Sequence, residues 1–184
     1  MRFLFLIVLV LSLFSKSLVA QESYIKERFN TKIGFCKYPV LGQGFPLKKY
    51  TPCFEIETNY GISEFLEFGA YLGYSQYKEI DIVIDNPNHF FSDSRPLTFY
   101  GLNLNVQLLP IFIKKDSFWL DLYLSSKVGG FYYWNASTFT QKKKRFDYGI
   151  YGGLAVHPFK HWGGFVEYGY GNYVQWRSGL SFNF

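Results

Sequence analysis

The sequence lacks the features that mark several common classes of protein. Beyond its first twenty positions it contains no apolar run of the ~18 residues that a membrane-spanning helix needs. No stretch keeps apolar residues at helical spacing over several turns, so a helical bundle is excluded as well. Cysteine, methionine and tryptophan are few, whereas 22% of the residues are aromatic, mostly Phe and Tyr. With a mean hydropathy of -0.03, the chain is too polar for a helical membrane protein and too apolar for a disordered one.

The first twenty residues, MRFLFLIVLVLSLFSKSLVA, have the order of parts that marks a secretory signal peptide. Arg2 precedes an apolar run, and small residues lead to Ala20. The sequence therefore predicts a cleaved signal peptide over residues 1–20 and a mature domain over residues 21–184. A membrane anchor is the alternative, but the apolar run is too short to span a bilayer of about 30 Å. Cleavage also removes Lys16, so the formal charge falls from +5 to +3, which is too small to indicate a nucleic-acid partner.

Alternation of large apolar and polar residues fills most of the remaining chain. In CFEIETNYG, for example, Phe54 and Ile56 alternate with the polar Glu55 and its polar neighbours. Side chains of a strand alternate between the two faces of a sheet, so each such segment predicts a strand with one apolar and one polar face. Similar segments are LEFGAYLGYSQY, YGLNLNVQL, FWLDLYLSSKV, DYGIYGGLAVH, GFVEYGYG and WRSGLSFNF. With a less regular first strand around Lys32 to Val40, the count is about eight, an even number that suits a closed antiparallel sheet.

The connections between these strands alternate in length. The short ones are Tyr60–Glu64, Pro110–Ser117 and Pro158–Trp162, and the longer, polar ones are Leu41–Thr51, Tyr77–Pro96 and Asn135–Arg145. Only the last hairpin, near Asn172, breaks this alternation by being tight. In an up-and-down barrel, alternating lengths place the short turns at one end and most long loops at the other. This asymmetry is typical of outer-membrane barrels, whose turns face the periplasm and whose loops face the outside.

The composition of the two faces indicates which face of the sheet is outside. The polar face contains glycines, which would cover a solvent-facing sheet poorly but fit where side chains crowd inside a narrow barrel. These glycines are Gly69, Gly73, Gly101, Gly149, Gly153, Gly169, Gly171 and Gly179. The other face has Leu and Val at mid-strand and Tyr, Phe and Trp toward strand ends, like a lipid belt between aromatic girdles. We therefore expect even positions from residue 54 onward to face lipid; a soluble lipocalin-like barrel would instead bury this face around a ligand.

The signal peptide, the alternating strands and connections, and a last strand ending in Phe184 together resemble the small outer-membrane β-barrels of the OmpA transmembrane-domain and OmpX type. The resemblance covers Thr31–Phe184 and lies in architecture rather than in an invariant motif. It implies an all-β fold, namely a closed antiparallel up-and-down transmembrane β-barrel in the bacterial outer membrane. It also implies two partners, the outer-membrane lipid and the insertion machinery that recognises a terminal aromatic after alternating apolar residues. The positions that match this insertion signal are Leu180, Phe182 and Phe184, with Tyr170 or Trp176 further back.

The interior of so narrow a barrel has room only for side chains, and here many of them are charged. They are Glu55, Glu57, Glu67, Asp121, Lys127, Asp147, Glu167 and Arg177. Folding the last hairpin about Asn172 places Glu167 opposite Arg177, and folding the first about its loop centre places Lys32 opposite Glu57. Such groups must pair, because a buried unpaired charge costs several kcal/mol. We favour a packed ionic plug that fixes the register, with a polar conduit or a proton-active site as the alternative.

The two cysteines, Cys36 and Cys53, flank the first predicted hairpin and face each other when it is folded. An exported protein with an even number of cysteines usually oxidises them, so the sequence predicts a disulfide. Closing a loop of about 17 residues contributes about 3 kcal/mol in the chain-entropy model. We expect no metal site, because neither a CxxC motif nor a histidine pair at ligand spacing accompanies the cysteines, and we expect no cofactor.

Catalysis would need a nucleophile with a base beside it, and the chain has few bases of that kind. The only histidines are His89, His157 and His161. The first lies in NPNHFFSDS near Ser92, Asp93 and Ser94, in an outer loop of ordinary turn formers. The other two bracket a short turn on the periplasmic side, and we interpret them as turn residues. The sequence thus predicts a protein without catalytic residues; an outer-leaflet lipid A-modifying enzyme, which resembles this architecture, is the alternative.

A basic run lies in the last long outer loop. It consists of Lys142, Lys143, Lys144 and Arg145. Such a run can contact the phosphates of lipopolysaccharide or another polyanion, although a solvated loop of this composition needs no partner. We expect an outer-membrane protein with a structural or surface-interaction role through its loops. A narrow channel and a secreted lipocalin-like carrier are the remaining alternatives.

Overall fold

The computed structural model describes residues 26–37, 47–50, 52–82, 90–112, 119–134, 144–159, 161–171 and 175–184. The strands are β1 (Phe29–Lys37), β2 (Leu47–Tyr50), β3 (Cys53–Gly61), β4 (Leu66–Ile82), β5 (Phe90–Gln107), β6 (Leu120–Tyr133), β7 (Lys144–Val156), β8 (Trp162–Gly171) and β9 (Trp176–Asn183). One helical turn, α2 (Leu109–Phe112), follows β5. Within this described part of the chain, no helix is long and apolar enough to cross a membrane. The predicted signal peptide, His89, Lys142 and Lys143 lie outside the described residues.

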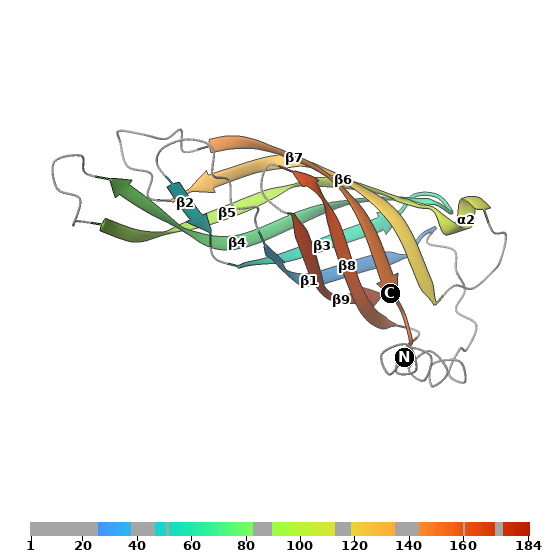
Figure 1. The fold of residues 1–184 in the computed structure, drawn as a ribbon. Helices are drawn as coiled ribbons and strands as arrows, with labels where there is room; N and C mark the ends of the chain where they lie inside the picture. Colours follow the sequence, from blue (N-terminus) through green and yellow to red (C-terminus); the bar gives the residue numbers. More distant parts are fainter. Residues whose placement is uncertain are drawn as a thin grey trace, which may run out of the picture.

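All strands except β2 close into an antiparallel barrel (Figure 1). Hydrogen bonds join them in the order β4-β3-β1-β9-β8-β7-β6-β5, and β5 returns to pair with β4. Barrel strands that follow each other in the chain are neighbours, and the seam between β1 and β9 completes the ring. Among the described residues, β2 pairs only with β4. The predicted all-β up-and-down barrel is therefore confirmed.

The two faces of the barrel are inverted relative to those of a soluble protein. On β5, Leu102 keeps 49% of its surface exposed, whereas Asn103 beside it keeps 2%. Of the described side chains from Phe54 onward, those at even positions on the barrel strands point outward and those at odd positions point inward, as predicted. Polar and charged residues, together with a group of buried aromatic residues, thus fill the interior, while apolar side chains cover the outside. A surface of this kind is stable in contact with lipid rather than with water.

The exposed apolar residues form three bands along the barrel. The middle band is aliphatic and includes Ile56, Leu72, Leu102, Leu124, Val166 and Leu180. Aromatic residues flank it at the end that carries Phe29 and Phe184, namely Tyr60, Phe65 and Trp162, and at the opposite end, namely Phe35, Phe54, Tyr74, Tyr100, Trp134, Phe146 and Tyr148. A strand of nine residues such as β3 rises about 30 Å, and a tilt of about 40° brings this to the ~25 Å height of a lipid-facing band.

Several boundaries differ from the sequence prediction. The first strand begins at Phe29 rather than Lys32 and ends at Lys37, while Tyr38–Val40 lie outside the described residues. The sequence predicts a loop over Leu41–Thr51, but β2 lies within it. It also predicts a loop over Tyr77–Pro96, whereas β4 continues to Ile82 and β5 begins at Phe90. The prediction treated Tyr77–Pro96 as one long polar connection, although Glu79–Ile82 still alternates polar and apolar residues as a strand does.

Candidate functional site in the barrel lumen

A network of six charged side chains occupies the lumen. It consists of the cations Lys32, Lys127 and Arg177 and the carboxylates Glu55, Glu57 and Glu167. These residues come from β1, β3, β6, β8 and β9, so the network spans the barrel from wall to wall. All six are buried, and the formal charges of the three cations and three carboxylates cancel. The structure therefore has the ion pairing that buried charges require.

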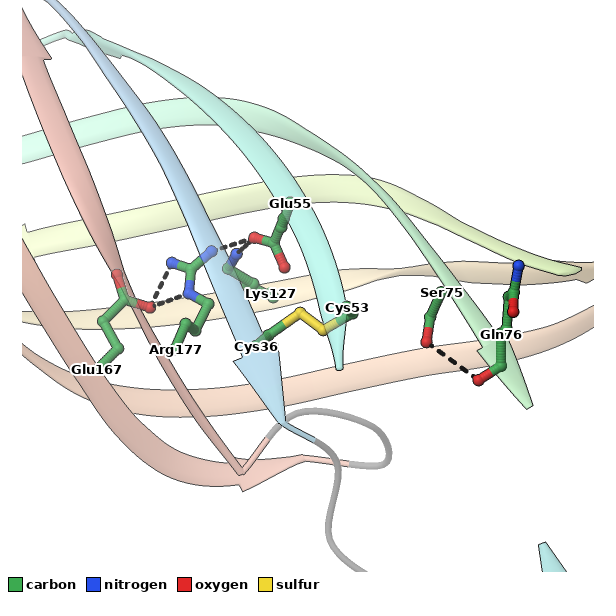
Figure 2. Close-up of a disulfide and its surroundings, with 8 residues drawn as sticks. All are labelled: Cys36, Cys53, Glu55, Ser75, Gln76, Lys127, Glu167 and Arg177. Atoms are coloured by element: carbon green, nitrogen blue, oxygen red, sulfur yellow. Dashed lines mark hydrogen bonds and ion pairs between the residues drawn. A yellow bond between two sulfur atoms is a disulfide. The ribbon is translucent and has the colours of Figure 1, made fainter. Parts of the chain in front are cut away.

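Arg177 is the centre of this network. Its Nε donates to Glu167 Oε2 at 2.5 Å, and its Nη1 contacts Glu55 Oε1 (Figure 2). Its Nη2 lies 2.6 Å from Glu57 Oε2 and also contacts Glu167. The guanidinium stands 5.6 Å from the centroid of the Phe165 ring. A planar guanidinium with five N–H donors can serve three carboxylates at once, which a lysine ammonium at this place could not do with the same geometry.

The two lysines extend the network to either side of Glu57. Lys32 Nζ lies 3.5 Å from Glu57 Oε1 and 3.3 Å from Glu167 Oε1, and it stands over the Tyr123 ring at 3.9 Å from the centroid. Lys127 Nζ lies 2.7 Å from Glu57 Oε2 and contacts Glu55. Each ammonium is therefore shared between two carboxylates, so loss of any one member leaves an uncompensated charge on its neighbours.

An apolar and aromatic layer lies in the lumen beside this network. It contains the disulfide between Cys36 and Cys53 together with Tyr71, Leu97, Phe99, Phe131, Tyr133 and Tyr151. Figure 2 shows the disulfide between the ion pairs and the outer part of β4, where Ser75 lies. Within this layer the Tyr71 hydroxyl donates to Asp147 Oδ2 at 3.3 Å. We call these eight residues the aromatic layer.

A second polar group lies in the lumen at the end that carries Phe29 and Phe184. His157 Nδ1 lies 3.2 Å from Asp121 Oδ2, and His157 Nε2 lies 3.1 Å from Ser181 Oγ. Asn30 Nδ2 donates to Asn183 Oδ1 at 2.9 Å across the β1–β9 seam. The first three residues are the types of a hydrolytic triad, but Ser181 has 0% of its surface exposed, so its hydroxyl cannot meet a substrate in this arrangement. These bonds instead tie β6, the end of β7, β9 and β1 together.

The structure brings the residues predicted from sequence together in the following way. Lys32 lies opposite Glu57 and Glu167 opposite Arg177, and both pairs are in ionic contact. Cys36 lies opposite Cys53 and is bonded to it. Leu180 is exposed on the outer face, and Phe182 and Phe184 have the same parity on and just after β9. Of the basic run, Lys144 and Arg145 begin β7 rather than belonging to a loop.

Two features of the site were not predicted. The interpretation of His157 as a turn residue is wrong, because its side chain is buried in the lumen and bonded to Asp121 and Ser181. The sequence prediction considered only residues that lie opposite each other on adjacent strands. It therefore missed the contacts that Arg177 and Lys127 make with Glu55, because these side chains meet across the lumen. The odd parity of position 157, shared with the other lumen residues of β7, was the signal that could have placed the histidine inside.

Glycines of the lumen make room for aromatic rings on the next strand. Gly153 lies opposite Tyr123, and Gly73 lies opposite Phe99. A side-chain carbon added at either glycine would overlap the facing ring. The sequence anticipated crowding at these positions, and the structure shows that the crowding groups are aromatic.

Replacing Gly153 with leucine should destabilise the barrel by about 1–3 kcal/mol, the usual cost of overpacking a filled interior. The leucine would push the Tyr123 ring away, and the Tyr123 hydroxyl would lose its 2.6 Å hydrogen bond to Glu167 Oε1. Urea unfolding in lipid vesicles measures the change. The matched control is Gly152→Leu, on the outer face, where the nearest atom to an added carbon is 3.9 Å away. Equal losses for the two variants would contradict a packed lumen.

The described residues contain no group of three or more His, Cys, Asp or Glu side chains placed to hold a metal ion. The arrangement instead provides mutual neutralisation of buried charge, a buried disulfide within the aromatic layer, and hydrogen bonds of His157 and Asn30 that join strands at the end that carries Phe29 and Phe184. These features define a class of fold: a small closed β-barrel with an apolar exterior and a filled, charged interior.

Comparison with known proteins gives the same class. No family model matches the sequence, and no curated protein is significantly similar to it. Among solved structures, the outer membrane protein OprG from Pseudomonas aeruginosa is 12% identical with a TM-score of 0.56, over 89% of this chain and 99% of that one. The attachment invasion locus protein Ail of Yersinia pestis, solved in complex with the heparin analogue sucrose octasulfate, is 15% identical with a TM-score of 0.55, over 86% and 99% of the two chains. At such identities the likeness concerns the fold, which is that of the small outer-membrane β-barrels.

Proposed function

We propose that this chain is an integral protein of the bacterial outer membrane, with a structural or surface-interaction role through its outer loops. The observation that carries the proposal is the inversion of the two faces. Large apolar side chains such as Leu72 and Ile150 stand exposed on the barrel, while Glu57 and Arg177 are buried within it. Lipid stabilises such an exterior, and two aromatic girdles fit the two interfaces of a bilayer.

The filled lumen favours this role over that of a channel. The charged network spans the barrel, and the aromatic layer lies beside it. The hydrogen-bonded group of Asp121, His157 and Ser181 lies near the end that carries Phe29 and Phe184. Small barrels whose side chains fill the interior leave no aqueous path. The same filling speaks against a lipocalin-like carrier, which needs an internal cavity lined by its apolar face.

A sheet that projects beyond the barrel supports interaction at the outer surface. β4 has 17 residues and β5 has 18, against nine in β1 and β3. Their outer parts continue as a paired hairpin to Ile82 and Phe90, and β2 adds to the side of β4 (Figure 1). At about 3.3 Å per residue, some eight extra residues reach roughly 25 Å past the ends of shorter strands. In the described part of the chain, no strand pairs with the other edge of Phe90–Ser94, and such edges are templates for an added strand.

Cell fractionation combined with gel mobility tests the proposal. We expect the protein in the outer-membrane fraction and, without boiling, a faster migration on an SDS gel than after boiling. An epitope inserted at Asp85, between β4 and β5, should bind antibody on intact cells, whereas the same epitope at Ser63, in the turn at the opposite end, should not. Recovery in the soluble fraction without a mobility shift would overturn the proposal.

The basic run is a second candidate for surface contact. The Ail structure contains a polyanionic heparin analogue, and a run of four basic residues could bind a polyanion or lipid phosphate in this chain by the same electrostatics. Lys144 lies opposite Tyr132, an outward-facing residue near the outer aromatic girdle, which is the level of lipid headgroups. Weaker retention of the intact barrel on a heparin column after replacing Lys142–Arg145 with alanine is the expected sign of such contact.

The insertion signal stays a prediction. The side chain of Phe184 is 74% exposed, so it is free to be recognised, while its backbone N–H and C=O both bond to Phe29 across the seam. We propose that outer-membrane lipid and the insertion machinery are the partners of this strand.

A further inference from the structure

The disulfide between Cys36 and Cys53 lies inside the barrel. The two residues face each other on β1 and β3, with their Cα atoms 4.9 Å apart. Cys36 and Cys53 keep 2% and 1% of their surface exposed. Both belong to the aromatic layer, and Arg177 of β9 lies opposite Cys36 on its other side (Figure 2). The sulfur atoms are therefore enclosed by side chains of the lumen.

Neither end of the lumen gives a protein or a thiol reagent a way to these sulfurs. On one side the aromatic layer includes Leu97 and Tyr133, each with 0% of its surface exposed. On the other side lies the charged network, with Arg177 bonded to three carboxylates. The walls are hydrogen-bonded strands without a gap between them. Thiol–disulfide exchange requires a sulfur of the reagent to approach a cysteine sulfur directly, and the closed barrel prevents that approach.

We infer that the Cys36–Cys53 disulfide forms before the barrel closes, by exchange with a thiol-oxidising protein that meets the unfolded first hairpin. One cysteine thiolate attacks the disulfide of the partner, forming a mixed disulfide and releasing one partner thiol. The second cysteine thiolate attacks the mixed disulfide, forming the Cys36–Cys53 bond and releasing the second partner thiol. The chain loses two electrons and two protons, and the partner gains them as a dithiol. Only the compartment in which this happens, the periplasm, rests on the proposed export of the chain.

The position of the pair in the chain fits this order of events. The cysteines are 17 residues apart and belong to the first hairpin of the barrel, so they can meet while every later strand is still unfolded. The bond fixes Cys36 opposite Cys53, and this register places Lys32 opposite Glu57. The oxidised hairpin thus carries one pair of the charged network, in register, into assembly. β1 is also the strand that β9 must find to close the ring.

The accessibility of the thiols in folded and unfolded chain tests the inference. The purified chain is reduced in urea, folded into detergent micelles, and exposed to oxidised glutathione; free thiols are then counted by a maleimide-polyethylene glycol gel shift after denaturation. We expect the folded, reduced barrel to be oxidised at least about 100-fold more slowly than the same chain in urea, because reaction must await opening of the barrel. If the reduced chain does not fold, the reverse reaction serves: dithiothreitol should leave the native disulfide intact until urea unfolds the barrel.

A matched control places the same cross-strand pair on the other face. Phe35 lies opposite Phe54, one residue away from the cysteines, and both are exposed on the outside. The variant with Cys36→Ser, Cys53→Ser, Phe35→Cys and Phe54→Cys should be oxidised and reduced readily in the folded state. Oxidation of the folded wild-type barrel at the rate of this control would overturn the inference, as would reduction of its native disulfide at the control rate. Either result would leave the fractionation test of outer-membrane location unaffected.

Discussion

Replacing Arg177 with methionine should destabilise the folded barrel by about 3–5 kcal/mol, the cost of removing one partner from a buried ionic group. Glu55, Glu57 and Glu167 would then share only the two lysines, and at least one carboxylate would stay buried without a full partner. Methionine keeps the length and apolar stem of the side chain, so the change reports the lost charge rather than a cavity. Urea unfolding from lipid vesicles, followed by tryptophan fluorescence, measures the loss.

Two further variants distinguish the loss of ion pairing in the lumen from the loss of a positive charge in general. Lys26→Met removes a cation at an exposed position and should change the free energy of unfolding by less than about 0.5 kcal/mol. The double variant Arg177→Met with Glu167→Gln should lose less than the sum of the two single changes, because the second substitution removes a charge that the first leaves unpaired. A loss below about 1 kcal/mol for Arg177→Met alone would show that the network does not hold the lumen together.

Replacing Leu102 with arginine should destabilise the barrel by about 2–4 kcal/mol in a bilayer, the measured range for a cation on the lipid face near the midplane. Leu102 lies between Ala70 of β4 and Val128 of β6, in the middle of the aliphatic band. The side chain at this position points outward into the aliphatic band. An arginine there must therefore draw water into the bilayer or extend its guanidinium toward an interface. The measurement is again urea unfolding from vesicles of defined lipid.

The control for this substitution is Gln76→Arg. Gln76 is exposed on the same outward parity but lies beyond the aromatic girdle, opposite Pro96. The same charge at this place should cost less than about 1 kcal/mol, because it meets water rather than hydrocarbon. If both arginines were tolerated equally, the aliphatic band would not face lipid.

The alternation of side chains was sufficient to predict which residues lie inside the barrel, since a strand in a bilayer has one apolar and one polar side. Folding the first and last hairpins about the centres of their connections gave their register, and Lys32–Glu57, Cys36–Cys53 and Glu167–Arg177 are opposite residues of adjacent strands as predicted. Neither the alternation nor the hairpin register could predict contacts across the lumen, which depend on side-chain length and on the tilt of the strands relative to the barrel axis. Arg177 to Glu55 is such a contact.

The sequence prediction was wrong at two places, the outer part of β4 and His157. Along Tyr77–Ile82 a strand signal was present, because Glu79–Ile82 alternates polar and apolar residues, but the segment was assigned to a long polar connection. His157 was misplaced for another reason. It follows the last residue of β7 and precedes a proline, which suggested a turn, yet its backbone N–H bonds to Trp119 C=O and continues the ladder by one residue.

The central claim is that the even-numbered face of the barrel contacts lipid, and spin labels on that face test it most directly. Single cysteines at Leu72, Leu102 and Leu104 can be labelled because the native cysteines are already joined in the disulfide. In lipid vesicles we predict labels that collide often with oxygen and rarely with a water-soluble nickel complex, and the opposite preference at Gln76. Labels at Leu72, Leu102 and Leu104 that are immobile and reached by neither reagent would place this face inside a soluble barrel and contradict the account.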